Sequence, residues 1–461
     1  MKRITLILSV ILFSLVGCQK DLIQLPATTK TADNFYSNET EIEEAVKGVY
    51  ATLQFTGNYN TAMPAIGELP GEDAYDETPA NDNGFYGQLD DINVISQNGV
   101  IQDNWAHSYI GIQRANIVLN RIGSISFKDS TVKNARIGEM KFLRALYYFN
   151  LVRIYGDVPL VTKEITNPIG SFGQSRAPKA DVYKQIEADL NEAIQLLPVR
   201  TTANKMRVVK TAAQTLLGKV KLTQKDFASA ETLLLAVENS GLHQLLADVT
   251  TVFPVTNELN NEIIFSVQFA SGINSNTEGS DAYRMFNPTG RVVGSMTGTK
   301  GHGVLKSSFY NLYDATDKRK NVYIGAIASG IGFNNKIAAP TTVVTDAASD
   351  WVVLRYADVV LMLAEIENEL GKTTQAVSYV NAIRTRAGLT TFASTDKATI
   401  FSEIDIQRRK ELVWEGHRWF DLLRQGRVQS VLGVSDVNKL LMPLPASQIA
   451  ADPALKQNPG Y

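Results

Sequence analysis

Residues 408–428, RRKELVWEGHRWFDLLRQGRV, combine an apolar stripe with regularly spaced charges. The apolar side chains recur at intervals of three and four residues, which places them on one face of a helix. The acidic and basic side chains alternate three residues apart, which predicts a ladder of ion pairs along that helix. Exposed pairs contribute only roughly tenths of a kcal/mol, so we expect them to orient the helix rather than to stabilise it strongly. The apolar positions are Leu412, Gly416, Trp419, Phe420 and Leu423, and the charged ones are Arg408, Glu411, Glu415, Arg418, Asp421 and Arg424.

Two carboxylates of this stretch suggest an alternative, catalytic interpretation. Glu411 and Glu415 share a predicted helix face, as the paired acids of a retaining glycosidase share a cleft. Each has arginine neighbours that would keep it ionised, whereas a general acid must hold a proton. We therefore interpret both residues as structural.

Two segments upstream resemble each other and predict a repeated helical unit. TAAQTLLGKVKLTQKDFASAETLLLAVENSGL (211–242) and RYADVVLMLAEIENELGKTTQAVSYVNAIRTRAGL (355–389) each contain a helical pattern, a short polar turn and a second helical pattern. An alanine lies one turn into each second helix, at Ala230 and Ala376. Hairpins of this length must stack on neighbours to bury their apolar faces, as tetratricopeptide-type repeats do. The pair predicts a helical-repeat scaffold.

The rest of the chain divides into helical segments and two irregular regions. Asn38 and Glu41 have the spacing of a capping box, which predicts a helix extending to about Gln54. Glycine, asparagine and aspartate dominate residues 57–103, and a long irregular stretch of this kind is usually functional. EIIFSVQF (262–269) alternates like a strand inside a second loop-rich region. Further helices are predicted at 104–122, 132–155, 178–197, 207–222 and 226–239.

The N-terminus has the pattern of a lipoprotein signal peptide. Two basic residues precede an apolar run, ITLILSVILFSLV (4–16), which is shorter than the ~20 residues of a membrane-spanning helix. The run ends in Leu-Val-Gly-Cys, which resembles a bacterial lipobox whose cysteine is lipidated. Several acyl chains anchor a protein stably, whereas one anchors it only marginally. We expect Cys18 to carry such an anchor, which would hold the mature protein at a membrane.

Composition and motif content exclude several classes of protein. The net charge is −2 without basic clusters, which argues against a nucleic-acid partner, and 44% hydrophobic residues suffice for a packed core. Cys18 is the only cysteine, so no internal disulfide forms. The acidic residues at 73–77 lack EF-hand spacing, and no G-x-S-x-G or P-loop motif occurs. We predict a binding protein without enzymatic activity, cofactor or metal. The histidines, none of them at metal-site spacing, are His107, His243, His302 and His417, and His302 is expected to be satisfied or solvent-facing.

Four blocks together resemble one family, the SusD/RagB nutrient-binding lipoproteins of Bacteroidetes. They are KFLRALYYFNLVRIYGDVPLV (141–161), LRYADVVLMLAEIENELG (354–371), the stretch at 408–428 and PLPASQIAADPALKQNPGY (443–461). Gln407 departs from the acidic residue expected before the arginine pair. The resemblance implies a mainly α fold, with a tetratricopeptide-like helical scaffold and an inserted loop-rich region containing a few short strands.

The resemblance also implies an organisation and a partner. Members of the family pack on a SusC-like, TonB-dependent transporter of the outer membrane and pass their cargo to it. Gln19-Lys20-Asp21 resembles the pattern after the cysteine in surface-displayed lipoproteins, which implies an anchor facing the exterior. We expect a signal peptide (1–17), a tether (18–37), helical repeats (38–240), a variable loop-rich region (241–350) and C-terminal repeats with the final family block (351–461).

Loop aromatics set among amides and carboxylates are the candidate ligand residues. An aromatic ring covers the apolar face of a sugar, while amides and carboxylates bind its hydroxyls, and side chains on loops are better candidates than those at helical spacing. Trp105, Trp414 and Trp419 are interpreted as core residues, and Trp351 stays ambiguous. The candidates are Tyr59, Tyr75, Asn83, Phe85 and Tyr86 in the first irregular region, and Tyr283 and Phe286 in the second.

The favoured function is capture of an oligosaccharide at the cell surface for a SusC-like transporter. The alternative keeps this role but changes the cargo to peptides, as RagB-like members suggest. Less favoured hypotheses are a repeat adaptor that binds no ligand and a lipid-anchored hydrolase. The sequence does not identify the sugar.

Overall fold

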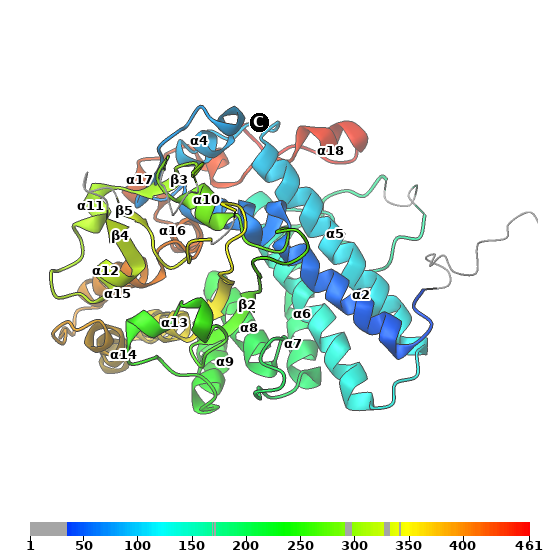
Figure 1. The fold of residues 1–461 in the computed structure, drawn as a ribbon, viewed down its shortest axis with the longest axis horizontal. Helices are drawn as coiled ribbons and strands as arrows, with labels where there is room; N and C mark the ends of the chain where they lie inside the picture. The colour runs from blue at the N-terminus through cyan, green and yellow to red at the C-terminus, as the bar shows by residue number, and fades with distance from the viewer. Residues whose placement is uncertain (1–34, 168, 170–171, 291–296, 327–331, 341–342) are drawn as a thin grey trace, which may run out of the picture.

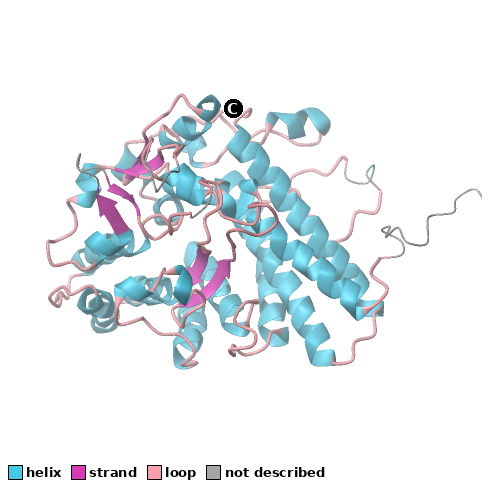
Figure 2. Cartoon of the chain, viewed as in Figure 1, coloured by secondary structure: helices cyan, strands magenta, loops and turns pink. Residues whose placement is uncertain are grey.

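The computed structural model describes residues 35–167, 169, 172–290, 297–326, 332–340 and 343–461. The signal peptide, Cys18 and most of the expected tether therefore lie outside the described residues. The described chain is mainly helical with small sheets, as predicted (Figure 2). Within it, no helix is both long and apolar enough to span a bilayer.

Long helices form a continuous packed series (Figure 1). Helices α5 to α9 pack each on the next, and α9 then packs on α13, which also contacts α14 and α15. This order confirms a scaffold of stacked helical hairpins. The bounds are α2 Glu39–Ala51, α5 Gly99–Arg121, α6 Ser130–Tyr155, α7 Lys179–Leu196, α8 Lys210–Thr223, α9 Phe227–Asn239, α13 Tyr356–Glu369, α14 Thr373–Arg386 and α15 Lys397–Leu412.

The two similar segments form the hairpins α8–α9 and α13–α14, as predicted. Ala230 and Ala376 are fully buried. A Cβ on Gly218 would lie 2.6 Å from the Leu234 side chain, so α8 and α9 approach closely at a residue without a side chain. Small residues at these contacts therefore let the hairpin helices pack.

Polar caps decide where several helices begin. The Asn38 side chain accepts from the Glu41 N–H (3.1 Å), and the Glu41 carboxylate accepts from the Ser37 N–H (2.8 Å), which confirms the predicted start of α2. The Asn98 side chain accepts from the Val100 N–H (2.9 Å). Helix α5 therefore begins at Gly99 and not near residue 104, because Asn98 supplies a cap that periodicity alone did not reveal.

The segment 57–103 contains more regular structure than its composition predicts. It includes the short helices α3 (Ala62–Glu68) and α4 (Phe85–Asp90), and every residue of α3 is buried. Helix α3 packs on α5 and on the C-terminal helix α16 (Arg418–Gln425). A helix of seven residues is too short to show a hydrophobic period, so its burial comes from tertiary contacts.

Antiparallel strands join regions distant in sequence. One sheet has the order β1-β3-β5-β4, and its first pair aligns Tyr75 with Val304 and Asp76 with His302. The second sheet pairs β2 with β6. The predicted strand is β2, but both of its faces are buried, so its alternation does not mark a solvent face. The bounds are β1 Ala74–Asp76, β2 Ile263–Val267, β3 His302–Leu305, β4 Ile324–Ala326, β5 Gly332–Asn334 and β6 Trp351–Arg355.

Short helices complete the inserted region and the C-terminus. Those of the inserted region lie beside the four-stranded sheet, and α18 lies near the upper end of α5 in Figure 1. The bounds are α10 Ala282–Phe286, α11 Ser307–Tyr310, α12 Arg319–Tyr323, α17 Val428–Leu432 and α18 Ala446–Ala451.

The prediction of one continuous helix with a local ion-pair ladder over 408–424 is wrong. Helix α15 ends at Leu412 and α16 begins at Arg418. Between them Trp414 has a left-handed φ of 58° and Gly416 one of 73°, so the chain turns where the period predicted continuity. Of the predicted ladder, the Arg424–Asp421 pair forms (2.9 Å). Arg408 also binds Asp421 (3.0 Å), across the turn between the two helices. The remaining charges of the stretch pair with residues outside it.

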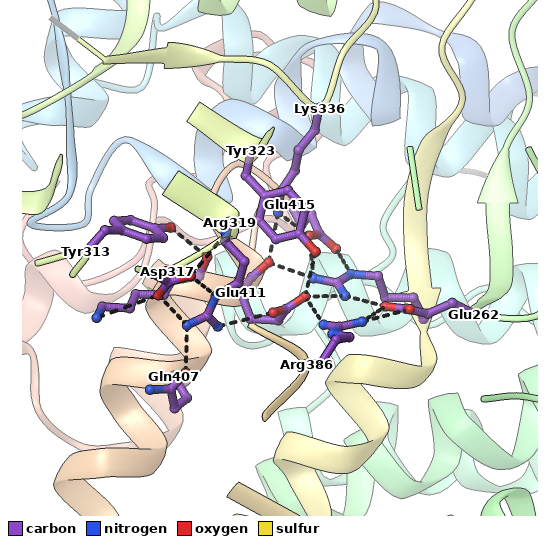
Figure 3. A network of polar contacts seen from close by, with 12 residues as sticks. Glu262, Tyr313, Asp317, Arg319, Tyr323, Lys336, Arg386, Gln407, Glu411 and Glu415 are labelled. Carbon is purple, nitrogen blue, oxygen red and sulfur yellow. Dashed lines mark hydrogen bonds and ion pairs between the residues drawn. The ribbon is translucent and has the colours of Figure 1, made fainter. Parts of the chain in front are cut away.

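Glu411 shows where these charges go (Figure 3). Its carboxylate binds Arg386 (2.5 Å) and Arg355 (2.9 Å) from other elements and is fully buried. Burial alone would raise the pKa of Glu411, but Arg386, Arg355 and Arg319 outweigh it and hold this pKa well below its ordinary value. The side chain is therefore ionised, which agrees with a structural role. We call the set Glu262, Arg319, Arg355, Arg386, Glu411 and Glu415 the sealed cluster.

Candidate ligand-binding site

A cavity of about 350 Å³ lies where the segment 57–103 meets the inserted region. Its walls come from α3, the turn before α4, the start of α5, helix α10 and the loop before β3. It is open to solvent and mixes apolar side chains with charged ones. The lining residues are Thr56, Thr61, Ala62, Asp82, Asn83, Phe85, Tyr86, Gly99, Val100, Asp103, Asp281, Arg284, Met285 and Lys300.

A left-handed turn places the acidic wall of the cavity. Asp82, Asn83 and Gly84 have φ values of 49°, 60° and 75°. Asp, Asn and Gly tolerate this conformation better than other residues, and consecutive left-handed residues store strain that is common at functional sites. The turn leaves Asn83 exposed and leads directly into α4, which carries Phe85 and Tyr86.

A chain of polar side chains runs from the protein interior to the cavity. The fully buried His302 contacts the Asp76 carboxylate through Nδ1 (2.9 Å) and the Asp82 carboxylate through Nε2 (2.7 Å). The Lys300 ammonium donates to both oxygens of Asp82 (2.6 and 2.9 Å). Although burial pushes the pKa of Asp82 upward, the hydrogen bonds from Lys300 and His302 outweigh it and lower that pKa. Asp82 is therefore an ionised, rigidly held acceptor.

His302 also supports the aromatic wall. The rings of Tyr86 and His302 stack, with their centroids 4.2 Å apart and their planes 14° from parallel. Burial raises the pKa of the Tyr86 hydroxyl well above its ordinary value, so this group stays protonated. One face of Tyr86 is thus covered by His302 inside the protein, while the residue still lines the cavity. A ring held in this way is preorganised to pack against a ligand.

A second ion pair lines the cavity. The Arg284 guanidinium donates to both oxygens of Asp281 (2.6 and 2.5 Å). The Asp281 backbone N–H donates to the Asn60 side chain (2.7 Å), which ties the inserted region to the segment 57–103. Burial raises the pKa of Asp281, and Arg284 opposes that effect. The pair keeps a cation and a carboxylate side by side at the cavity wall.

Three of the seven predicted ligand residues lie at this cavity. Asn83, Phe85 and Tyr86 line it. The other four do not, and ligand contact by any of the seven stays a prediction. Tyr59 is buried and its hydroxyl accepts from Asn150 (3.0 Å), Tyr75 pairs with β3, and Tyr283 and Phe286 are buried in α10.

Of the polar residues of the site, Asn83 was a predicted ligand candidate, whereas the charged residues were not. Arg284 and Lys300 lie on α10 and in the loop before β3, and Asp103 lies one turn inside α5. The sequence pattern points to aromatic residues on loops, whereas nothing in the sequence around these charged residues indicates that they converge in space. The expectation that His302 is satisfied is confirmed, because both its ring nitrogens have carboxylate partners.

The tryptophans lie in the core. Trp105, Trp414 and Trp419 are buried, as predicted, and Trp351, which was ambiguous, is buried at the start of β6. The Trp414 indole N–H donates to the Gly303 carbonyl (2.8 Å), next to His302. This core residue therefore connects the C-terminal turn to the strand that supports the cavity.

The acidic residues at 73–77, which lack the spacing of an EF-hand, have protein partners. Asp73 forms an ion pair with Arg409, Asp76 binds His302, and Glu77 accepts from the Thr289 N–H (2.7 Å). Within the described ranges, no group of three or more His, Cys, Asp or Glu side chains is arranged to hold a metal ion.

A larger hollow of about 790 Å³ lies elsewhere, between α5, residues of 159–166 and 172–174, and α18. Its exposed lining is mainly apolar, with Ile110, Ile165 and Phe172 among its residues. Specific recognition of a hydroxyl-rich ligand needs several converging donors and acceptors. The smaller cavity supplies them, so we regard it as the candidate site.

A helical-repeat scaffold presents an open cavity lined by aromatic and ion-paired side chains, an arrangement that suits the binding of a ligand. The chain belongs to the SusD-like family. Residues 329–461 match the model described as "SusD family", and residues 28–222 match "Starch-binding associating with outer membrane". Proteins of this family bind ligands at the outer membrane.

Individual relatives agree with this assignment. SusD-like protein P2 of Formosa agariphila is 27% identical over the full length of both chains. The structure titled "Laminarin binding SusD-like protein" is 27% identical, with a TM-score of 0.81, and covers 92% of this chain and 100% of its own. Surface glycan-binding protein A from Bacteroides thetaiotaomicron, solved with laminarihexaose, has a TM-score of 0.80 at 22% identity over 92% of this chain and 100% of its own. That last likeness concerns the fold alone.

Proposed function

We propose that this chain captures an oligosaccharide at the cell surface and delivers it to a SusC-like, TonB-dependent transporter. The observation that carries the proposal is the open cavity in which a supported tyrosine ring faces converging charged groups. A pyranose presents apolar C–H faces and a belt of hydroxyls, and this cavity offers partners for both. Membership of a glycan-binding family and the 27% identity to a laminarin-binding protein support it.

The chemistry of the site supports binding without turnover. Asp82 and Asp281 are each held by a cation, and Asp82 also by His302. A hydrolase needs one carboxyl that holds a proton and a second that attacks or activates water. Asp82, which Lys300 and His302 keep ionised, does not suit the role of the acid and serves as a fixed hydrogen-bond acceptor. We infer that the chain is a binding protein and no enzyme.

Titration calorimetry of the full chain against oligosaccharides and peptides tests the ligand class. We expect an oligosaccharide to bind and Tyr86→Ala to weaken that binding by about 1–3 kcal/mol, because it removes a central ring. The matched control is Tyr75→Ala, which removes an aromatic of the same segment that does not line the cavity. Binding of peptides alone would replace the glycan proposal by the peptide alternative. An equal loss in both variants would mean that Tyr86 is not a ligand residue.

We further propose that Cys18 carries the lipid that holds the protein at the outer membrane, facing outward. Cys18→Ala should move the protein from the membrane fraction to the medium or periplasm while ligand affinity stays unchanged, because the cavity is built from residues 56–300. A Cys18→Ala protein that stays in the membrane fraction would contradict the anchor. Co-purification with a SusC-like transporter would test the partner separately.

A further inference from the structure

Among the described residues, the two cations that line the cavity each have a carboxylate partner. Lys300 contacts both oxygens of Asp82, and Arg284 contacts both oxygens of Asp281. All four side chains keep access to solvent, between 14% and 32% of their surface. A ligand therefore meets two neutral pairs rather than two free positive charges.

These pairs still have hydrogen-bonding capacity. An ammonium has three N–H groups and a guanidinium five. Lys300 directs its donors to two oxygens of Asp82, and Arg284 uses Nε and Nη2 for Asp281. The remaining N–H groups have no hydrogen-bond partner among the described residues, so they can donate to hydroxyl oxygens of a ligand without an excess of positive charge. Vicinal hydroxyls, which both donate and accept, match such alternating partners.

The remaining charge in the lining is negative. Asp103 is exposed on α5 and lines the cavity, and it makes no ion pair with any residue in the described part of the chain. Its field reaches a neighbour, since it raises the pKa of His107 against the lowering by burial, which is the larger effect. An anionic group about 5 Å from Asp103 is disfavoured roughly fourfold even with the dielectric constant of bulk water, and more in a partly enclosed cavity.

We propose that the cavity selects neutral oligosaccharides and rejects carboxylated or sulfated ones. The selection arises because both lining cations are neutralised by Asp82 and Asp281, while Asp103 repels an anion. This inference rests on the proposed glycan-binding function and names the charge class of the ligand. It predicts a charge preference that the aromatic wall alone would not produce.

The test uses the full chain and a panel of oligosaccharide pairs. Each pair contains a neutral oligosaccharide, such as a laminarin fragment, and the same molecule oxidised at C6 to carboxylates. We expect the neutral member of a bound pair to bind at least about tenfold more tightly at low salt. The ratio should shrink when salt is raised, because screening weakens the repulsion.

Asp103→Asn isolates the source of this preference. The substitution replaces the carboxylate by an amide of similar shape and so removes the charge. The ratio of the affinities for the neutral and the anionic oligosaccharide should therefore fall by about threefold or more. The matched control is Asp91→Asn, which removes an exposed charge at the end of α4 that does not line the cavity, and it should leave the ratio unchanged. Restored preference in an Asp103→Glu variant would support the charge itself as the cause.

Two results overturn the inference while the proposed function stands. One is a bound pair whose anionic member binds as tightly as the neutral one, or more tightly. The other is a ratio that Asp103→Asn does not change. Failure of every oligosaccharide to bind would instead overturn the proposed function, and the inference with it.

Discussion

The sealed cluster around Glu411 and the ion pairs of the cavity both consist of carboxylates and cations, but the two groups differ in burial. In the sealed cluster, Glu411 and Arg355 are no more than 1% exposed, and each makes several charged contacts. At the cavity, Lys300 and Asp82 keep 29% and 32% of their side-chain surface in contact with solvent. Sealed charges must satisfy one another completely, whereas charges at an open wall keep donors and acceptors for a ligand. Burial thus separates a structural use of carboxylates and cations from a recognition use.

Glu411→Gln should have the largest effect in the molecule on stability. It leaves Arg319, Arg355 and Arg386 buried with one carboxylate fewer, and breaking a buried ion pair from one side costs about 3–5 kcal/mol. Chemical denaturation measures the loss, and failure to accumulate folded protein would be its extreme form. The control is Asp181→Asn, which removes one member of an exposed pair with Lys184 and should change stability by less than about 0.5 kcal/mol. Equal losses of stability in both variants would mean that burial does not decide how much an ion pair of this protein contributes.

Glu68 is a third case, because its carboxyl group is buried but forms no ion pair within the described residues. Burial raises the pKa of Glu68 to about 8, against a hydrogen bond from the Trp414 N–H (2.8 Å). The folded protein therefore holds a proton that the unfolded chain releases above about pH 4.5. The stability that this proton contributes is fully present below that pH and is lost as the pH rises through about 8.

Glu68→Gln should remove this part of the pH dependence. The amide cannot ionise, so the free energy of unfolding of the wild type should fall relative to the variant between about pH 5 and 8. The slope of that difference is up to roughly 1.4 kcal/mol per pH unit. Measuring both proteins over this range cancels the groups that they share. Parallel curves would show that Glu68 is already ionised in the folded state.

Lys300→Met should have the smallest effect on stability and a separate effect on binding. The partly exposed pair with Asp82 contributes at most about 1 kcal/mol to the free energy of unfolding. The unfolding midpoint should therefore hardly change. Affinity for a neutral oligosaccharide should fall about three- to tenfold, because one donor is lost from the cavity. Calorimetry and thermal unfolding of the same variant check both statements. A large loss of stability with unchanged affinity would assign Lys300 to the fold rather than to the site.

Much of the scaffold could be predicted because its signals are local. The Asn38 cap, the matching hairpins at 211–242 and 355–389, and the buried tryptophans all follow from spacing along a few turns of helix. The helix break at Trp414 could not be predicted, because neither composition nor hydrophobic period indicates that a tryptophan adopts a left-handed backbone conformation. Its backbone N–H is held by Glu68, 346 residues away along the chain.

The candidate site shows the same division. Asn83, Phe85 and Tyr86 were found as polar and aromatic residues of an irregular segment, and they line the cavity. Arg284, Lys300 and Asp103 were not, because each lies in an ordinary local context and becomes part of a site only where the segment 57–103 meets the inserted region. Tyr283 and Phe286 fit the sequence pattern equally well but turn into the core.

The sequence by itself determined the helical hairpins, the Asn38 cap and the family, since these depend on side chains within a few residues of one another. The tertiary structure decided which charges meet. The predicted ladder over 408–424 kept the Arg424–Asp421 pair, while Glu411 is bound by arginines from three distant segments. Attraction between charges depends on distance in space and on burial, and spacing along one helix specifies neither.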